Sequence, residues 1–121
     1  VKSPVVSITN MPWNLEVTSE CSKRTLDIKQ FSIFAYCNVG NKNLHWSCEA
    51  KVTFNLLSSK SRQKSHSREP IVHTFCSKQN AMGHASFIAW DKLLDPVNGF
   101  IREEDGGVVI EVTITVTKVI G

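Results

Sequence analysis

Hydrophobic and polar side chains alternate with a period of two along two long stretches of the chain. The first runs from Trp46 to Leu56, and the second runs from Val108 to Thr117, with threonine at most of its polar positions. This spacing is typical of a β-strand with one buried and one solvated face, and threonine favours strands. Weaker runs predict further strands at Val5–Thr9, Leu15–Val17, Phe31–Cys37, Ile71–Cys76 and Ala85–Ala89.

Turn-forming residues separate these runs, and no long segment keeps the spacing of an amphipathic helix. A single helical turn is expected at Trp90–Leu94. Because 121 residues suffice for one hydrophobic core and are too few for two, one domain is predicted over residues 1–121. About seven to eight short strands predict an all-β fold, an antiparallel β-sandwich of two packed sheets. The turns lie at Asn10–Pro12, Asn38–Asn41, Asp95–Gly99 and Asp105–Gly107.

The surplus of positive charge is concentrated in one polar stretch, Ser58–Glu69. The formal net charge is +3, from 14 Lys and Arg against 11 Asp and Glu. A nucleic-acid-binding protein usually spreads positive charge over a face, and a membrane span needs roughly 18 apolar residues. The chain shows neither pattern, so no nucleic-acid or membrane partner is expected. The stretch is predicted to be a flexible, solvated hairpin loop; its basic residues are Lys60, Arg62, Lys64 and Arg68.

The four cysteines form no closely spaced pair, and free thiols are expected. This favours a nuclear or cytoplasmic location. His45 with Cys48, and His73 with Cys76, would supply the ligand count of a zinc site. Residues three apart in a strand project to opposite faces, so neither a zinc site nor another cofactor is predicted. The cysteines are Cys21, Cys37, Cys48 and Cys76.

No combination of residues supplies a catalytic site. A reactive thiolate needs a helix N-terminus or a cationic neighbour, and no helix is expected near these cysteines. The acidic segment that begins at Asp95 resembles a calcium-binding loop. However, Val97 and Gly106 occupy its third and twelfth positions, where an oxygen ligand and a glutamate are required. The chain is therefore predicted not to be an enzyme.

Short motifs are spaced along nearly the whole chain, at Asn10–Trp13, Tyr36–Asn38, Trp46–Ala50, Phe87–Trp90, Asp95–Pro96 and Gly99–Ile101. In this order and spacing they resemble the MATH (meprin and TRAF homology) domain, and within it the TRAF-like domains of ubiquitin-specific proteases. Each motif alone is weak, but together they are specific. The resemblance implies the same sandwich, used to dock a partner protein without catalysis.

The resemblance also implies a site. In the family, a short extended peptide lies in a shallow groove and pairs with the strand that corresponds to Ala81–Ser86. Main-chain bonds then give affinity, and alternate side chains give selectivity. Phe34 and Ile71 match apolar residues of the groove floor, and Gly83 matches a glycine that lets the peptide backbone approach. The implied site residues are Glu20, Phe34, Ile71, Ala81, Met82, Gly83, His84 and Ser86.

The docking strand departs from the family pattern. The chain has Ala81-Met82-Gly83-His84 where related domains have Asp-Trp-Gly-Phe, and Glu20 stands about where they have arginine. Loss of a charge-assisted acceptor removes about 1.5–3 kcal/mol, which would abolish a weak peptide interaction. The family's peptide preference is therefore not expected here. Met82 and His84 would form a more apolar, adaptable groove, or the domain serves another contact.

The family usually opens with an aromatic-rich strand ahead of the segment that matches Val1–Pro4, and this chain lacks it. Two alternatives follow. Either the segment begins after this strand, or the sheet has an unpaired edge or an uncovered apolar strip, which invites a partner strand or a homo-oligomer. Three functions stay open. They are a partner-docking domain of a deubiquitinase-like protein, the substrate-recognition domain of a BTB-type cullin-ligase adaptor, and a self-associating structural module.

Overall fold

The structure is a computed structural model, and it describes residues 2–8, 10–21, 29–40, 42, 44–61, 65–102 and 104–120. Within this part the chain is almost entirely β, which confirms the predicted fold class. The elements are β1 (Val6–Ile8), β2 (Met11–Cys21), β3 (Lys29–Cys37), β4 (Ser47–Leu56), β5 (His66–Ser67), β6 (Ile71–Cys76), β7 (Ala81–Ala89), α1 (Trp90–Leu94) and β8 (Ile110–Ile120).

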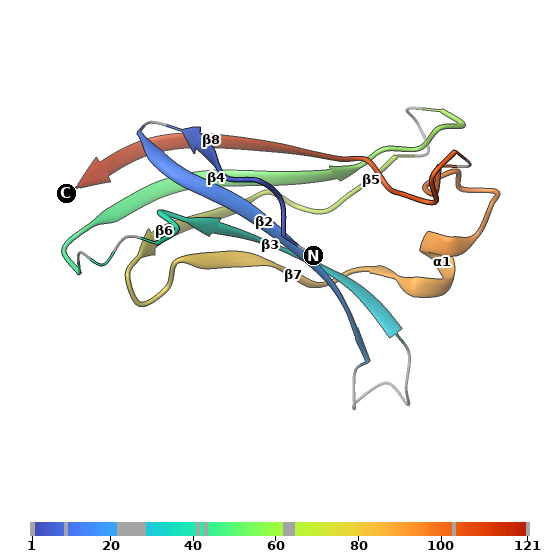
Figure 1. Cartoon of the computed structure of the whole chain (residues 1–121), viewed down its shortest axis with the longest axis horizontal. Coiled ribbons are helices and arrows are strands. Elements are labelled where there is room, and N and C mark those ends of the chain that lie inside the picture. Colours follow the sequence, from blue (N-terminus) through green and yellow to red (C-terminus); the bar gives the residue numbers. More distant parts are fainter. Residues whose placement is uncertain are drawn as a thin grey trace.

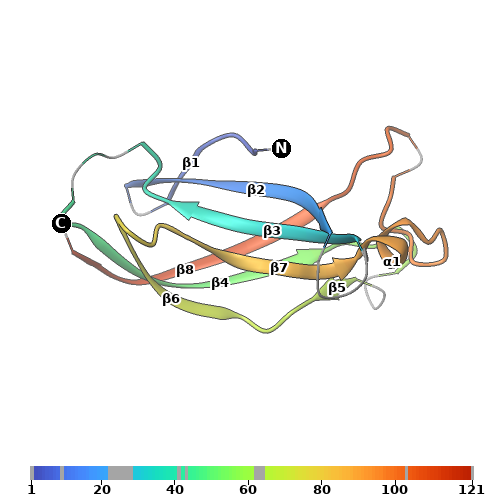
Figure 2. The same ribbon diagram turned by 90° about the horizontal axis from the view of Figure 1, so that it is seen from below.

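The strands form two antiparallel sheets that pack as the layers of a sandwich (Figures 1 and 2). The first sheet has the order β1-β2-β3-β7. In the second sheet β4 is central: β8 pairs with its whole length, while β6 and β5 pair with its first and last parts. Because each strand has two edges, β5 and β6 share the side of β4 that β8 leaves open. Strands β7 and β8 are therefore edge strands among the described elements.

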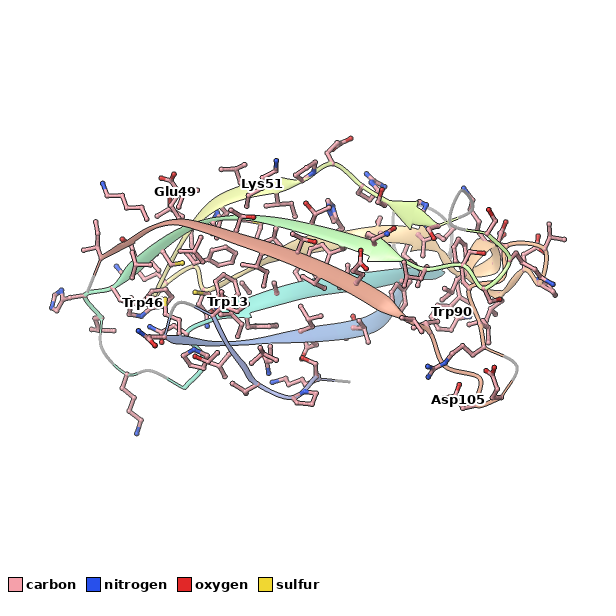
Figure 3. The ribbon with its side chains drawn as sticks, turned by 90° about the horizontal axis from the view of Figure 1, so that it is seen from above. Trp13, Trp46, Glu49, Lys51, Trp90 and Asp105 are labelled. Atoms are coloured by element: carbon pink, nitrogen blue, oxygen red, sulfur yellow. The ribbon has the colours of Figure 1, made fainter. Side chains whose placement is uncertain are left out.

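The core lies between the sheets, and the alternation seen in the sequence builds it. Strand β4 buries every second side chain, from Cys48 to Leu56, and leaves Glu49 and Lys51 exposed. From the first sheet, β3 buries the alternate residues from Phe31 to Cys37. Figure 3 shows Trp13 and Trp46 toward one end of the sandwich, with Trp90 and Asp105 toward the other. Among the described residues no helix has the length and apolar character to cross a membrane.

Strand β2 corrects one predicted turn. It begins at Met11, so Met11 and Pro12 belong to a strand, and Leu15–Val17 is only its middle. The turn ends at Asn10, which has a φ of 61°. Asparagine tolerates this left-handed conformation better than most residues. Met11 and Trp13 are both buried in the core, and this burial extends the strand through the proline.

The described ends of the Ser58–Glu69 stretch, residues 58–61 and 65–69, depart from the flexible loop that the sequence predicts. The stretch contains β5, which pairs with the end of β4. Its first residues are anchored as well, because the Ser58 hydroxyl donates to the Asn98 carbonyl at 2.5 Å and Ser59 donates to Gly99 at 3.0 Å. Arg62 and Lys64 lie outside the described residues. The two described ends of the stretch therefore contact the segment after α1 and β7.

Candidate functional site

The site residues implied by the sequence divide between the two faces of the first sheet. Phe34 lies opposite Gly83 in the β3–β7 register, and Tyr36 lies opposite Ala81. Their neighbours Ile33 and Ala35 are fully buried in the core. Since successive side chains in a strand point to opposite faces, Phe34 and Tyr36 lie on the outer face. Together with Ala81 and Gly83 of β7 they form an outer surface that we call the β7 docking face. We call the two aromatic side chains the floor of this face.

A polar cluster borders this face on the side of β2. The Tyr36 hydroxyl donates to the Glu16 carboxylate at 3.2 Å, and Lys2 lies 3.8 Å from the same carboxylate. The Lys2 ammonium also lies 5.9 Å from the centre of the Tyr36 ring, within the range of a cation–π contact. Burial, and then the charge of Glu16, raise the pKa of Tyr36. These contacts hold the Tyr36 ring in place as part of the floor.

The structure gives a reason for glycine at position 83 that is independent of the family resemblance. A Cβ atom at this position would lie 2.0 Å from the carbonyl oxygen of Ile33 and 2.6 Å from the Cα atom of Phe34. Both are backbone atoms of β3. Only glycine lets β7 approach β3 this closely, so the residue is explained by pairing within the sheet before any peptide is considered.

The free edge of β7 presents unpaired main-chain groups over a short stretch. The Cys37 amide donates to the Asn80 carbonyl at 2.8 Å. Because hydrogen-bonded and non-bonded pairs alternate along an antiparallel ladder, Met82 and His84 direct their backbone groups toward β3. Ala81 and Gly83 therefore direct theirs away from the sheet, where another strand could pair with them.

Beyond His84, a bulge in β7 ends the stretch of edge with which another strand could pair. The register shifts between Phe31 and Ile33, so that Ala85, Ser86 and Phe87 lie opposite Ser32 alone. Ser32 is fully buried, and its hydroxyl donates to the Ala85 carbonyl at 2.5 Å. A bulge of this kind bends a strand away from its partner and interrupts the ladder.

Two side chains from β5 and the residue after it form hydrogen bonds to backbone carbonyls in the bulged part of β7. His66 donates from Nε2 to the Phe87 carbonyl at 2.8 Å, and Arg68 donates to the Ser86 carbonyl at 3.2 Å. Ser86 is exposed, but it lies in this occupied stretch and not beside Phe34. Sequence reasoning missed His66 and Ser32, because neither carries a local signal for contacts with residues so distant in the chain.

The inner side of β7 faces the core. Met82 packs against the core cluster, as does Ile71 from β6. The His84 ring lies edge-on to Phe54 at 6.0 Å. Burial, and then the positive charge of Arg68, lower the pKa of His84, so this side chain is neutral at neutral pH. Met82, His84 and Ile71 therefore lie on the core-facing side of the sheet. Of the two residues expected on the groove floor, Phe34 and Ile71, only Phe34 lies on the outer face.

Glu20 lies away from the other site residues. It pairs with Gln30 near the end of β2, and β3 separates β2 from β7. Its side chain lies outside the described part of the structure. The structure therefore brings Phe34, Ala81 and Gly83 together on one face, and Met82, His84 and Ile71 on the inner side.

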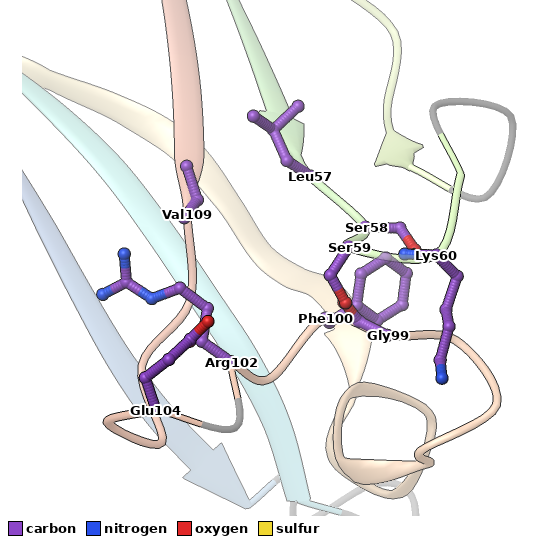
Figure 4. A pocket seen from close by; sticks show the side chains of 9 residues that line it. All are labelled: Leu57, Ser58, Ser59, Lys60, Gly99, Phe100, Arg102, Glu104 and Val109. Atoms are coloured by element: carbon purple, nitrogen blue, oxygen red, sulfur yellow. The ribbon is translucent and has the colours of Figure 1, made fainter.

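A second concave surface, of about 420 Å³, lies between the end of β4 and the segment that leads into β8 (Figure 4). Three of its polar side chains, Ser58, Ser59 and Arg102, already have partners within the chain. Arg102 pairs with Asp105 at 2.7 Å. A hydrogen bond from the Gly107 amide, and then the charge of Arg102, lower the pKa of Asp105. Because its serine hydroxyls and its arginine are engaged, this surface offers few groups to a ligand.

The cysteines lack the surroundings of a nucleophile. Cys37, Cys48 and Cys76 are free thiols, and the first two are buried; the Cys21 side chain lies outside the described residues. Burial strongly raises the pKa of Cys37, with a further contribution from Cys48, and burial also raises the pKa of Cys48. The described residues contain no group of three potential metal ligands; His45 is exposed while Cys48 points into the core.

Comparison with known proteins gives consistent matches. A sequence model of the family described as "MATH domain" matches residues 1–114. BTB and MATH domain-containing protein 38 of Caenorhabditis elegans is 34% identical over 121 residues, which are the whole of this chain and 30% of that protein. BTB and MATH domain-containing protein 39 of Caenorhabditis briggsae is 29% identical over 87% of this chain and 30% of its own length.

A relative with a different name matches the same region. Ubiquitin carboxyl-terminal hydrolase 7 of Drosophila melanogaster is 28% identical over 93% of this chain, which corresponds to 9% of that protein. The chain therefore spans less than a third of each of these three relatives.

Proposed function

Because the chain belongs to the MATH domain family, a class of non-catalytic protein-interaction modules, we propose that it binds an extended segment of a partner protein as an added strand on the β7 edge. One observation carries this proposal: Ala81 and Gly83 direct unpaired main-chain groups outward, beside the aromatic floor of Phe34 and Tyr36. An added strand would bond to those groups and lay alternate side chains on the floor.

The departures of this chain from its family at Met82 and His84 lie on the interior side of β7, while Phe34 and Tyr36 of β3 form the aromatic floor. Met82 packs inward, and His84 is held neutral, so neither supplies a charge to the docking face. Glu16, at the border, is already engaged by Tyr36 and Lys2. A partner segment with an apolar or small side chain over Phe34 therefore fits this face better than one that relies on a charged contact.

The relatives suggest the setting in which such docking is used. They include a ubiquitin hydrolase and proteins with BTB and MATH domains, which supports a proposed role in the ubiquitin pathway. A nuclear or cytoplasmic location is proposed separately, from the free thiols. The identity of 34% over the whole chain with a BTB and MATH domain-containing protein favours a second role, recognition of substrates for a BTB-type ligase adaptor. Sequencing the transcript past Gly121 distinguishes the two settings.

The docking face is tested by affinity capture from cell extract with the 121-residue chain, followed by peptide mapping of the retained protein. Phe34→Asp should lose the mapped peptide, because a carboxylate on the floor would be desolvated by the added strand. Val72→Asp is the matched control, since Val72 is 71% exposed on β6. Both variants should melt within a few degrees of the unchanged protein.

Ala81→Pro tests the backbone part of the proposal. It removes an outward amide and leaves the β3 ladder intact, as proline can do on an edge strand. The peptide found with the unchanged protein should bind this variant at least tenfold more weakly. Normal binding by both Phe34→Asp and Ala81→Pro would show that the partner uses another surface.

A further inference from the structure

Arg68 is an exposed cation at the end of the open β7 edge. It lies in the connection between β5 and β6, and its guanidinium donates a hydrogen bond to the Ser86 carbonyl at 3.2 Å. An arginine side chain carries five N–H donors, so most of its donors remain available. Among the described residues no carboxylate pairs with Arg68. The open edge therefore ends at a cation that has no counter-charge within this part of the chain.

The segment around Arg68 is fixed on both sides, so its position is set before any partner arrives. On one side, His66 and Ser67 of β5 pair with the end of β4. On the other side, the backbone of Glu69 accepts a hydrogen bond from His84 of β7. Strand β5 and the part of β7 before α1 lie at the same end of the sandwich (Figure 2). A side chain held at its base in this way loses less freedom when it binds.

The electrostatic field at this end of β7 is positive. After burial, the largest influence on the pKa of His84 is the charge of Arg68, which lowers it, and the opposite effect of Glu69 is smaller. Glu16, at the far border of the docking face, is already engaged. A partner segment that brings a negative charge to Arg68 is therefore complementary to this end of the edge, and one that brings a positive charge is repelled.

We propose that the segment that docks on β7 carries an aspartate or glutamate that pairs with Arg68, two or three residues from the residue that covers Phe34. The proposal rests on the docking proposed above. Gly83 lies opposite Phe34 and is three residues from Ser86, which is about 10 Å along a strand. A segment that follows β7 therefore brings its second or third residue beyond the floor alongside Arg68. The planar guanidinium can hold a carboxylate there by two parallel hydrogen bonds.

Such a contact would fix the register of the docked segment. The bulge interrupts the ladder beyond His84, so main-chain bonds alone do not decide which residue of the segment lies over Phe34. An exposed ion pair adds only about two- to fivefold in affinity. However, a segment shifted by two residues loses it together with the contact on the floor, so the pair of contacts selects one register.

Selection from a random peptide library displayed on phage, against the 121-residue chain and against Arg68→Glu, tests the proposal. Peptides selected by the unchanged chain should share an apolar or small residue with an acid two or three positions away. Arg68→Glu should select lysine or arginine in place of the acid, a reversal that a merely structural role of Arg68 would not produce. Lys51→Glu makes the same charge change at an exposed position of β4 and should select acidic peptides.

Binding of one selected peptide, followed by fluorescence anisotropy, measures the contact. Replacement of the peptide's acid by its amide should weaken binding about two- to fivefold, and so should Arg68→Gln. The two changes together should cost no more than either alone, because both remove the same interaction. High salt should reduce the effect. Losses that add up in the double change would overturn the pairing with Arg68.

The outcomes separate this proposal from the docking on which it rests. Peptides that bind through Phe34 but show no acidic preference, or that keep the preference with Arg68→Glu, overturn the contact with Arg68 and leave the docking in place. A selection that enriches no common sequence, or peptides indifferent to Phe34→Asp, overturn the docking and this proposal with it. Should Arg68→Glu not fold, Arg68→Gln and the salt dependence decide the question.

Discussion

Replacement of Gly83 by alanine separates two explanations of this glycine. If it serves the pairing of β7 with β3, an added methyl group must meet the Ile33 oxygen at 2.0 Å and the Phe34 Cα atom at 2.6 Å. Neither is the end of a flexible side chain, so β7 itself must move outward by about 1 Å or more to restore ordinary contact. If the glycine serves only the approach of a peptide, the free domain should tolerate alanine.

The expected cost follows from the position of the clash. Overpacking in a well-packed region costs about 1–3 kcal/mol, and Gly83→Ala should lie at the upper end because two backbone segments have to separate. For a domain of this size each kcal/mol lowers the melting temperature by about 3–6 °C. We therefore expect a fall of roughly 10 °C or more, together with faster exchange of the amides that β3 and β7 share.

Thermal unfolding followed by circular dichroism measures this effect, and Gly40→Ala supplies the control. Gly40 has a φ of +80°, and no atom lies within 4 Å of the place that an added methyl group would take, so alanine there costs only about 1–2 kcal/mol of backbone strain. Gly83→Ala should be clearly the less stable of the two. A Gly83→Ala variant that melts within 2 °C of the unchanged protein but binds its partner poorly would refute the pairing argument.

Three further predictions concern the interior. Ser32→Ala should lower the free energy of unfolding in urea by about 1–3 kcal/mol, since it leaves the Ala85 carbonyl without its donor. His84 has a lowered pKa when folded and a normal value of 6.5 when unfolded, so the unfolded chain binds more protons in acid. Stability should be constant above pH 6.5 and fall below it, and His84→Gln should flatten this dependence. Iodoacetamide should modify Cys76 before Cys37 in the native protein, as peptide mass spectrometry will show, because Cys37 is buried with a raised pKa.

The strands that the sequence predicted well are those whose two faces differ most. Strand β4 and the first part of β8 have a polar outer face and an apolar inner one, and their alternation is uninterrupted. Strand β6 was also placed correctly at Ile71–Cys76. In β2 the alternation is present from Met11 onward, but Pro12 suggested a turn. A proline is acceptable there because its backbone faces the side of β3, as the Val39 amide bond to the Pro12 carbonyl shows, and β3 ends at Cys37, before the position opposite Pro12.

Strand β7 was only half predicted, because its local features interrupt the period. Gly83 has no side chain to contribute, and the bulge at Ala85–Phe87 breaks the alternation. The family resemblance brought Phe34, Ala81 and Gly83 to one site, and the register places them together. The contacts of His66 and Arg68 with β7 join residues that are 21 and 18 positions apart in the sequence. No local sequence pattern predicts contacts between residues so far apart.

If a partner segment docks on β7 as proposed, the shortness of the open β7 edge decides how that partner is recognised. Only Ala81 and Gly83 have outward main-chain groups before the bulge, and each hydrogen bond contributes about 0.5–1.5 kcal/mol net. The carbonyls of Ser86 and Phe87, which would prolong the ladder, are already bonded to Arg68 and His66. Main-chain pairing alone therefore cannot hold a segment tightly. Most of the affinity must come from the side chain that covers Phe34, so partners that differ at this one position should differ most in binding.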